Sequence, residues 1–76
     1  LKRLSLSGNR IAPRAARVLS LSHALAGLRA LDLSDCHMGD KELRHLTRAK
    51  FWPNLVELDL RGNSFSAAGV RALADA

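Results

Sequence analysis

The chain begins with Leu1-Lys2-Arg3-Leu4-Ser5-Leu6-Ser7-Gly8-Asn9, and the same pattern returns 27 positions later, over 28–36. A third copy begins at Leu55 and carries Asn63 where the first carries Asn9. Each copy reads L-x-x-L-x-L-x-x-N/C-x-φ, in which φ is an apolar residue. Two further apolar sets share the offset: Ile11, Met38 and Phe65, and Leu19, Leu46 and Leu73. A repeat of this length indicates stacked supersecondary units.

Two kinds of periodicity alternate within each copy. Apolar and polar residues alternate in three stretches, which predicts strands with one buried face: Leu4-Ser5-Leu6, Leu31-Asp32-Leu33 and Leu58-Asp59-Leu60. Downstream of each stretch, apolar residues at helical spacing predict helices over 13–22, 40–49 and 67–75. Pro13 suits a first helical position, Asp40 suits the positive end of a helix dipole, and Ser66 suits an N-cap.

The repeated residues resemble the leucine-rich repeat family, and the repeat length and helical second half resemble its ribonuclease-inhibitor-like type. The resemblance covers essentially all of the chain. It implies an α/β fold: a right-handed β/α solenoid, or horseshoe segment, with a concave parallel sheet and convex helices. We expect one segment with repeats 1–27, 28–54 and 55–76. Because the chain lacks an initiator Met and ends within a predicted helix, we expect it to be a fragment of a longer array, able to self-associate through uncapped ends.

Composition agrees with a small folded unit. The chain has 76 residues, of which 47% are hydrophobic and 25% are charged, so intrinsic disorder is excluded. A chain this short buries only about 60% of the surface that it exposes when unfolded. The single Cys36 excludes an internal disulfide framework and favours a reducing compartment, which with the repeat type predicts a cytoplasmic location. No apolar run approaches the roughly 18 residues of a membrane span.

Asn9, Cys36 and Asn63 share one position of the repeat, where the resembled family has a buried polar ladder. Stacked turns leave backbone groups unpaired between coils, and a side chain that donates to a carbonyl satisfies them. A structural role is therefore expected for Cys36, although a nucleophile and a redox-sensitive thiol stay open as alternatives.

The sequence carries none of the motifs of common enzymes: no phosphate-binding loop, dinucleotide fingerprint, H-E-x-x-H pair or G-x-S-x-G elbow occurs. His23, His37 and His45 occupy different repeat positions, and no two have the spacing of a helical metal pair. We therefore expect no catalytic residue, no metal and no cofactor, and predict that the chain is not an enzyme.

Polar residues between the strand leucines should project from the concave face. Asp32 and Asp59 share a repeat position on adjacent strands, so two carboxylates about 5 Å apart need a positive neighbour. Arg3, Arg29 or Arg61 could supply it, or a partner's Lys or Arg; a catalytic dyad is disfavoured. The mixed-charge surface favours protein recognition. The predicted partner-binding residues are Arg3, Ser5, Asp32, Ser34, Glu57, Asp59 and Arg61.

The net charge of +5 gathers mostly on the predicted helices, where Arg17, Arg44 and Arg71 share a repeat position. This stripe is a candidate anion-binding surface, although a solvated face is the favoured interpretation and an acidic protein is an alternative partner. Nucleic acid and anionic lipid are disfavoured because no aromatic residues interleave the stripe. Trp52 is expected to fill the core, with an exposed binding hot spot as the alternative.

These observations predict a non-catalytic protein-interaction scaffold that binds another protein, whose identity stays open, through the concave face. The resemblance also implies an alternative: a ligand-sensing or autoinhibitory arm of a larger NTPase or effector enzyme, such as a ubiquitin-ligase effector, with its catalytic domain outside this chain.

Overall fold

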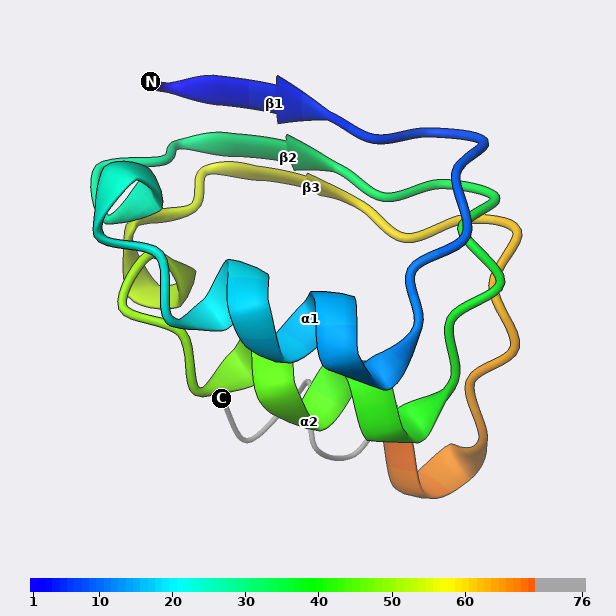
Figure 1. Ribbon diagram of the computed structural model, residues 1–76. Coiled ribbons are helices and arrows are strands. Elements are labelled where there is room, and N and C mark those ends of the chain that lie inside the picture. Colours follow the sequence, from blue (N-terminus) through cyan, green and yellow to red (C-terminus); the bar gives the residue numbers. More distant parts are fainter. Residues whose placement is uncertain (70–76) are drawn as a thin grey trace.

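The computed structural model describes residues 1–69, which form a parallel sheet on one side and a layer of helices on the other (Figure 1). The sheet contains β1 (Arg3–Ser5), β2 (Ala30–Asp32) and β3 (Glu57–Asp59), in that order. The helical layer contains α1 (Pro13–Ser20) and α2 (Asp40–Thr47), which pack against each other. The predicted α/β repeat is confirmed at this level.

The offset of 27 residues in the sequence becomes the register of the sheet. Leu4 pairs with Leu31, and Leu31 pairs with Leu58, in parallel. Each strand begins one residue earlier than the alternation predicts, because the N–H of Ala30 already donates to the carbonyl of Lys2 at 3.0 Å. Backbone pairing sets strand bounds, whereas side-chain alternation shows only which face is buried.

The starts of the helices agree with the sequence, but their ends do not. Pro13 is the first residue of α1, and Asp40 is the first residue of α2. The predictions of helices to 22 and 49 are wrong, since both helices end two residues earlier and the chain then tightens. Short 3-10 helices, η1 (His23–Leu25) and η2 (Trp52–Asn54), follow them. Bonds from residue i to i+3 have replaced the α pattern at these ends.

The third predicted helix lies only in part within the described residues. Residues 67–69 are helical, and 70–75 lie outside the described part. The Oγ of Ser66 accepts from the N–H of Gly69 at 3.4 Å, which is the contact of an N-cap.

The core lies between the sheet and the helices and is densest in the middle coil. Leu31 and Leu33 are 4% and 0% exposed, whereas Leu4 and Leu58, on the edge strands, are only partly buried. Coils in the middle of a stack are covered on both sides, so their apolar side chains are buried most completely. Phe51 fills this core at 1% exposure, and the neighbouring Trp52 is half-buried against it.

Candidate functional site

Two rows of side chains cross the outward side of the sheet. They are the register sets Arg3, Ala30 and Glu57, and Ser5, Asp32 and Asp59. Successive residues of a strand point to opposite faces, and the intervening leucines pack into the core on the other side. We call these six positions the sheet face.

An ion pair crosses the sheet face from one edge strand to the other. Nη1 of Arg3 donates to Oε2 of Glu57 at 3.2 Å. Between them in the register lies Ala30, whose short side chain leaves room for the two longer ones. The two charged side chains are 75% and 64% exposed, so water screens the pair and its free energy is small.

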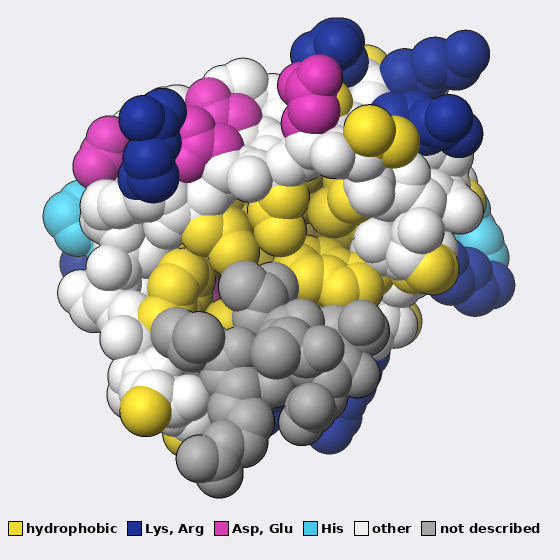
Figure 2. All heavy atoms as spheres, turned by 180° about the vertical axis from the view of Figure 1, so that it is seen from behind, with side chains coloured by type: hydrophobic (Ala, Val, Ile, Leu, Met, Phe, Trp, Pro, Cys, Tyr) yellow, Lys and Arg dark blue, Asp and Glu magenta, His cyan; other side chains and the backbone are white. Residues whose placement is uncertain are grey.

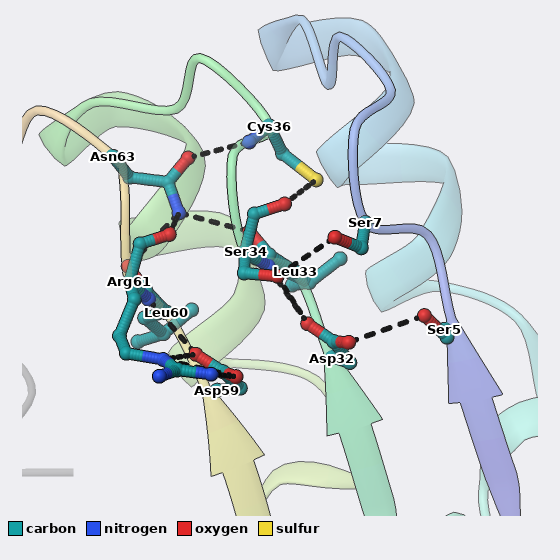
Figure 3. A network of polar contacts seen from close by, with 10 residues as sticks. All are labelled: Ser5, Ser7, Asp32, Leu33, Ser34, Cys36, Asp59, Leu60, Arg61 and Asn63. Atoms are coloured by element: carbon teal, nitrogen blue, oxygen red, sulfur yellow. Dashed lines mark hydrogen bonds and ion pairs between the residues drawn. The ribbon is translucent and has the colours of Figure 1, made fainter.

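Asp32 is held by hydroxyl and amide groups rather than by a cation (Figure 3). Its Oδ1 accepts from the N–H and Oγ–H of Ser34 at 3.0 and 2.7 Å, and its Oδ2 accepts from Ser5 at 3.2 Å. These bonds, those from Ser34 first, lower the pKa of Asp32, while its burial and the charge of Asp59 oppose the shift. Within residues 1–69, no Lys or Arg forms an ion pair with Asp32. The carboxylate is therefore charged and not neutralised there.

Ser34 was expected to be an exposed contact residue, but its side chain is covered by its neighbours. It is 8% exposed, because its hydroxyl turns toward Asp32 and also lies 2.8 Å from the hydroxyl of Ser7. Ser7 was not among the expected site residues. The signal that could have found it is the offset itself, since Ser7 and Ser34 share a repeat position.

Asp59 has a cationic partner two residues along the chain. Its Oδ1 accepts from the backbone N–H and the Nε of Arg61 at 3.1 and 3.0 Å, and its Oδ2 accepts from Nη2 at 2.8 Å. These contacts with Arg61 lower the pKa of Asp59. Of the three arginines that could neutralise the aspartate pair, Arg61 pairs with Asp59 and Arg3 pairs with Glu57.

A shallow depression of about 470 Å³ lies over the sheet. Its lining consists of all six positions of the sheet face and the three strand leucines Leu4, Leu31 and Leu58. Four of the lining side chains carry charge at neutral pH, namely Arg3, Asp32, Glu57 and Asp59. A shallow, polar and charged surface of this kind suits contact with another macromolecule better than enclosure of a small molecule.

The residues that follow β2 and β3 at one repeat position, Cys36 and Asn63, connect successive coils (Figure 3). Oδ1 of Asn63 accepts from the N–H groups of Cys36 and Met38 at 3.1 and 2.9 Å, and its Nδ2 donates to the carbonyl of Leu33 at 2.8 Å. Sγ of Cys36 donates to the carbonyl of Leu6 at 3.1 Å.

Asn9 differs from the other two residues of this repeat position. Its Nδ2 donates at 3.0 Å to the carbonyl of Leu6, which lies in its own coil.

Cys36 is fully buried, and burial raises the pKa of its thiol. Both features leave Cys36 poorly placed as a nucleophile.

On the opposite side of the fold, Arg17 of α1 and Arg44 of α2 are exposed at matching repeat positions. Arg71, the third member of the predicted stripe, lies outside the described residues. The stripe therefore consists of two arginines in the part that the structure describes.

Within residues 1–69, no group of three or more His, Cys, Asp or Glu side chains is placed to hold a metal ion. In that same part of the chain, no helix has both the length and the apolar character that crossing a bilayer requires.

Comparison with known proteins gives one match. A family model described as Leucine Rich repeat matches residues 1–20, 28–41 and 53–74, which include every strand of the sheet, all of α1 and the first two residues of α2. No curated protein and no solved structure matches the chain. The matched stretches contain the strand leucines and the residues that connect the coils, and they cover well over half of the sequence. The chain belongs to the leucine-rich repeat family.

Proposed function

We propose that this chain is a non-catalytic scaffold that binds a partner protein through its sheet face. Leucine-rich repeats generally mediate protein–protein interaction. The observation that carries the proposal is the sheet face itself, where the register of three strands fixes charged side chains above a shallow depression. The proposed contact residues are Arg3, Ser5, Asp32, Glu57, Asp59 and Arg61, with Ser34 holding Asp32 in place.

The fixed backbone is what makes the sheet face suited to recognition. A surface that is already ordered loses little conformational entropy when it binds. Complementary charge across an interface selects the partner and its orientation more than it adds affinity. The bonds from Ser5 and Ser34 to Asp32 and from Arg61 to Asp59 hold two carboxylates in fixed positions before any partner arrives.

We include the finer architecture in this proposal. Repeats 1–27, 28–54 and 55–76 would form a segment of a ribonuclease-inhibitor-like solenoid, with the sheet face on its concave side. The recurrence of an α-helix after β1 and after β2, at a constant offset, supports this type. A cytoplasmic location belongs to the same proposal and rests on the single unpaired cysteine, Cys36.

The test compares capture of proteins from a cell lysate by three forms of the chain. One is the native chain, the second carries Asp32→Lys and Glu57→Lys on the sheet face, and the third carries Arg17→Glu and Arg44→Glu on the helices. Both variants reverse two charges, and all three forms must give the same circular dichroism spectrum. The proposal expects a protein that the native and helix-variant forms retain and the sheet variant loses. Retention by the sheet variant together with loss by the helix variant would place the contact on the helices.

A further inference from the structure

Charge on the sheet changes sign along the strand direction. Lys2 and Arg29 are exposed where β1 and β2 begin, whereas Asp32, Asp35 and Asp59 lie where β2 and β3 end. In Figure 2, most of the Asp and Glu side chains lie toward one end of the sheet, with one basic side chain among them, and several Lys and Arg side chains gather at the other end. The two ends of this surface therefore attract opposite charges.

Two adjoining depressions carry these opposite charges. The one of about 470 Å³ is lined by Arg3 against Asp32, Glu57 and Asp59, and Arg61 pairs with Asp59 beside it, which gives two positive and three negative charges, or −1. The neighbouring one, of about 310 Å³, is lined by Lys2, Arg3 and Arg29 against Glu57, which gives three minus one, or +2.

The depressions join where Arg3, Ala30 and Glu57 line both of them. The exposed ion pair of Arg3 and Glu57 lies at this junction and contributes no net charge to it. A bound chain segment that spans both depressions therefore passes over this ion pair, which lies above Ala30.

Asp32 is the negative group that a partner can neutralise. Asp59 already forms an ion pair with Arg61, and Glu57 forms one with Arg3. Asp32 receives only hydrogen bonds from Ser5 and Ser34 among the described residues. At the other end, Val56 is 73% exposed and lines the positive depression, so it offers an apolar contact beside Lys2 and Arg29.

We propose that the sheet face binds a segment of a partner protein that carries charges of opposite sign at its two ends. The segment places a Lys or Arg side chain against Asp32 and an Asp or Glu side chain between Lys2 and Arg29. Arg29 directly precedes β2 and Asp32 ends it, so the two ends of the site lie about 10 Å apart along the backbone. This inference rests on the proposed function, because it specifies the partner of the same face.

The test uses a displayed library of random 16-residue peptides, selected for binding to the immobilised full chain. Affinities of the enriched peptides are then compared between the native chain and the variants Asp32→Asn, Lys2→Gln/Arg29→Gln and Asp35→Asn. Asparagine keeps the oxygen that accepts from Ser34, so Asp32→Asn changes charge with little change in shape. Asp35→Asn is the matched control, since Asp35 is an exposed aspartate that lines neither depression.

The inference expects enriched peptides that carry both an acidic and a basic residue. Their affinity should fall about ten-fold with Asp32→Asn and with Lys2→Gln/Arg29→Gln, and less than about two-fold with Asp35→Asn. A fourth variant, Ala30→Trp, fills the junction of the depressions. If circular dichroism shows that it misfolds, Ser5→Tyr, which fills only the depression of about 470 Å³, replaces it as the blocked variant.

Two results overturn the inference and leave the proposed function standing. In the first, peptides lose affinity for Ala30→Trp but not for Asp32→Asn. In the second, their affinity falls with only one of Asp32→Asn and Lys2→Gln/Arg29→Gln. Peptides that bind the blocked variant as well as the native chain, or the absence of any enriched peptide, overturn both.

Discussion

Arg3 and Glu57 form an ion pair across the full width of the sheet, with 3.2 Å between Nη1 of Arg3 and Oε2 of Glu57. The pair joins the first and the third coil. It passes over Ala30 of the middle strand, which is the register partner of Arg3 on one side and of Glu57 on the other. Because both side chains are largely exposed, we interpret it as a feature of the binding surface rather than a major source of stability.

This interpretation predicts a small coupling free energy between the two residues. In a double-mutant cycle of Arg3→Ala and Glu57→Ala, followed by urea unfolding, we expect a coupling of about 0.2–1 kcal/mol, further reduced by added salt. A coupling above about 2 kcal/mol would mean that the pair holds the coils together.

Asn63→Ala and Asn9→Ala make the same change at the same repeat position but should differ in cost. Both residues donate from Nδ2 to a carbonyl of their own coil, and Asn63 also bonds two N–H groups and a carbonyl of the preceding coil. At about 1 kcal/mol for each bond, and more where a buried group is left unpaired, Asn9→Ala should lower the free energy of unfolding by about 1 kcal/mol and Asn63→Ala by about 3 kcal/mol more. Urea unfolding of both variants tests this, and equal costs would contradict it.

Gly8, Asp35 and Gly62 share a repeat position and all have a positive φ, of 79°, 54° and 75°. A Cβ at Gly8 would meet nothing within 4 Å, but a Cβ at Gly62 would overlap Oδ1 and Cγ of Asp35. Gly8→Ala should therefore cost only the backbone term of about 1–2 kcal/mol, and Gly62→Ala should cost more. Thermal unfolding of both variants measures the difference.

The extra cost at Gly62 has an internal control. In an Asp35→Gly background the clashing carboxylate is absent and only the approach of 3.2 Å to the backbone N of residue 35 remains, so most of the difference between Gly62→Ala and Gly8→Ala should disappear. If the difference persists there, contact with Asp35 is not its cause.

Asp40 should make the stability of the fold depend on pH. The hydroxyl of Ser66, followed by its backbone N–H, lowers the pKa of Asp40 below its ordinary value. A carboxylate with a lowered folded pKa stabilises the fold above its unfolded pKa, about 3.9. That stabilisation is lost as the pH falls through the folded pKa.

Asp40→Asn removes this titration, while Asp32 and Asp59 keep theirs. Between about pH 6 and pH 3, the variant should lose less of its free energy of unfolding than the native chain loses. Urea unfolding at the two pH values measures both losses. An identical loss in the two proteins would show that the contact with Ser66 contributes nothing to the pH dependence.

The sequence predicted the features that depend on spacing. A constant offset of 27 residues required Leu4, Leu31 and Leu58 to stack, and the sheet has that register. Where the strands begin could not be read in the same way, because backbone hydrogen bonds decide it and leave no pattern in the side chains.

The contacts of flexible side chains could not be predicted from spacing. Three arginines could have reached the aspartate pair, and only the folded geometry shows that Arg61 pairs with Asp59. Ser34 looked like an outward residue, but its hydroxyl has two partners that draw it down to the surface of the sheet. Such choices depend on competing hydrogen bonds rather than on repeat position.

The sheet, and not the helical layer, is the surface that we propose meets the partner protein. The most direct measurement is the change in backbone amide chemical shifts of the isotope-labelled chain when a captured partner is added. We predict that the largest changes fall at Ser5, Ala30, Asp32 and Glu57, while the amides of α1 and α2 change little. Changes confined to Arg17, Arg44 and their helical neighbours would contradict the account.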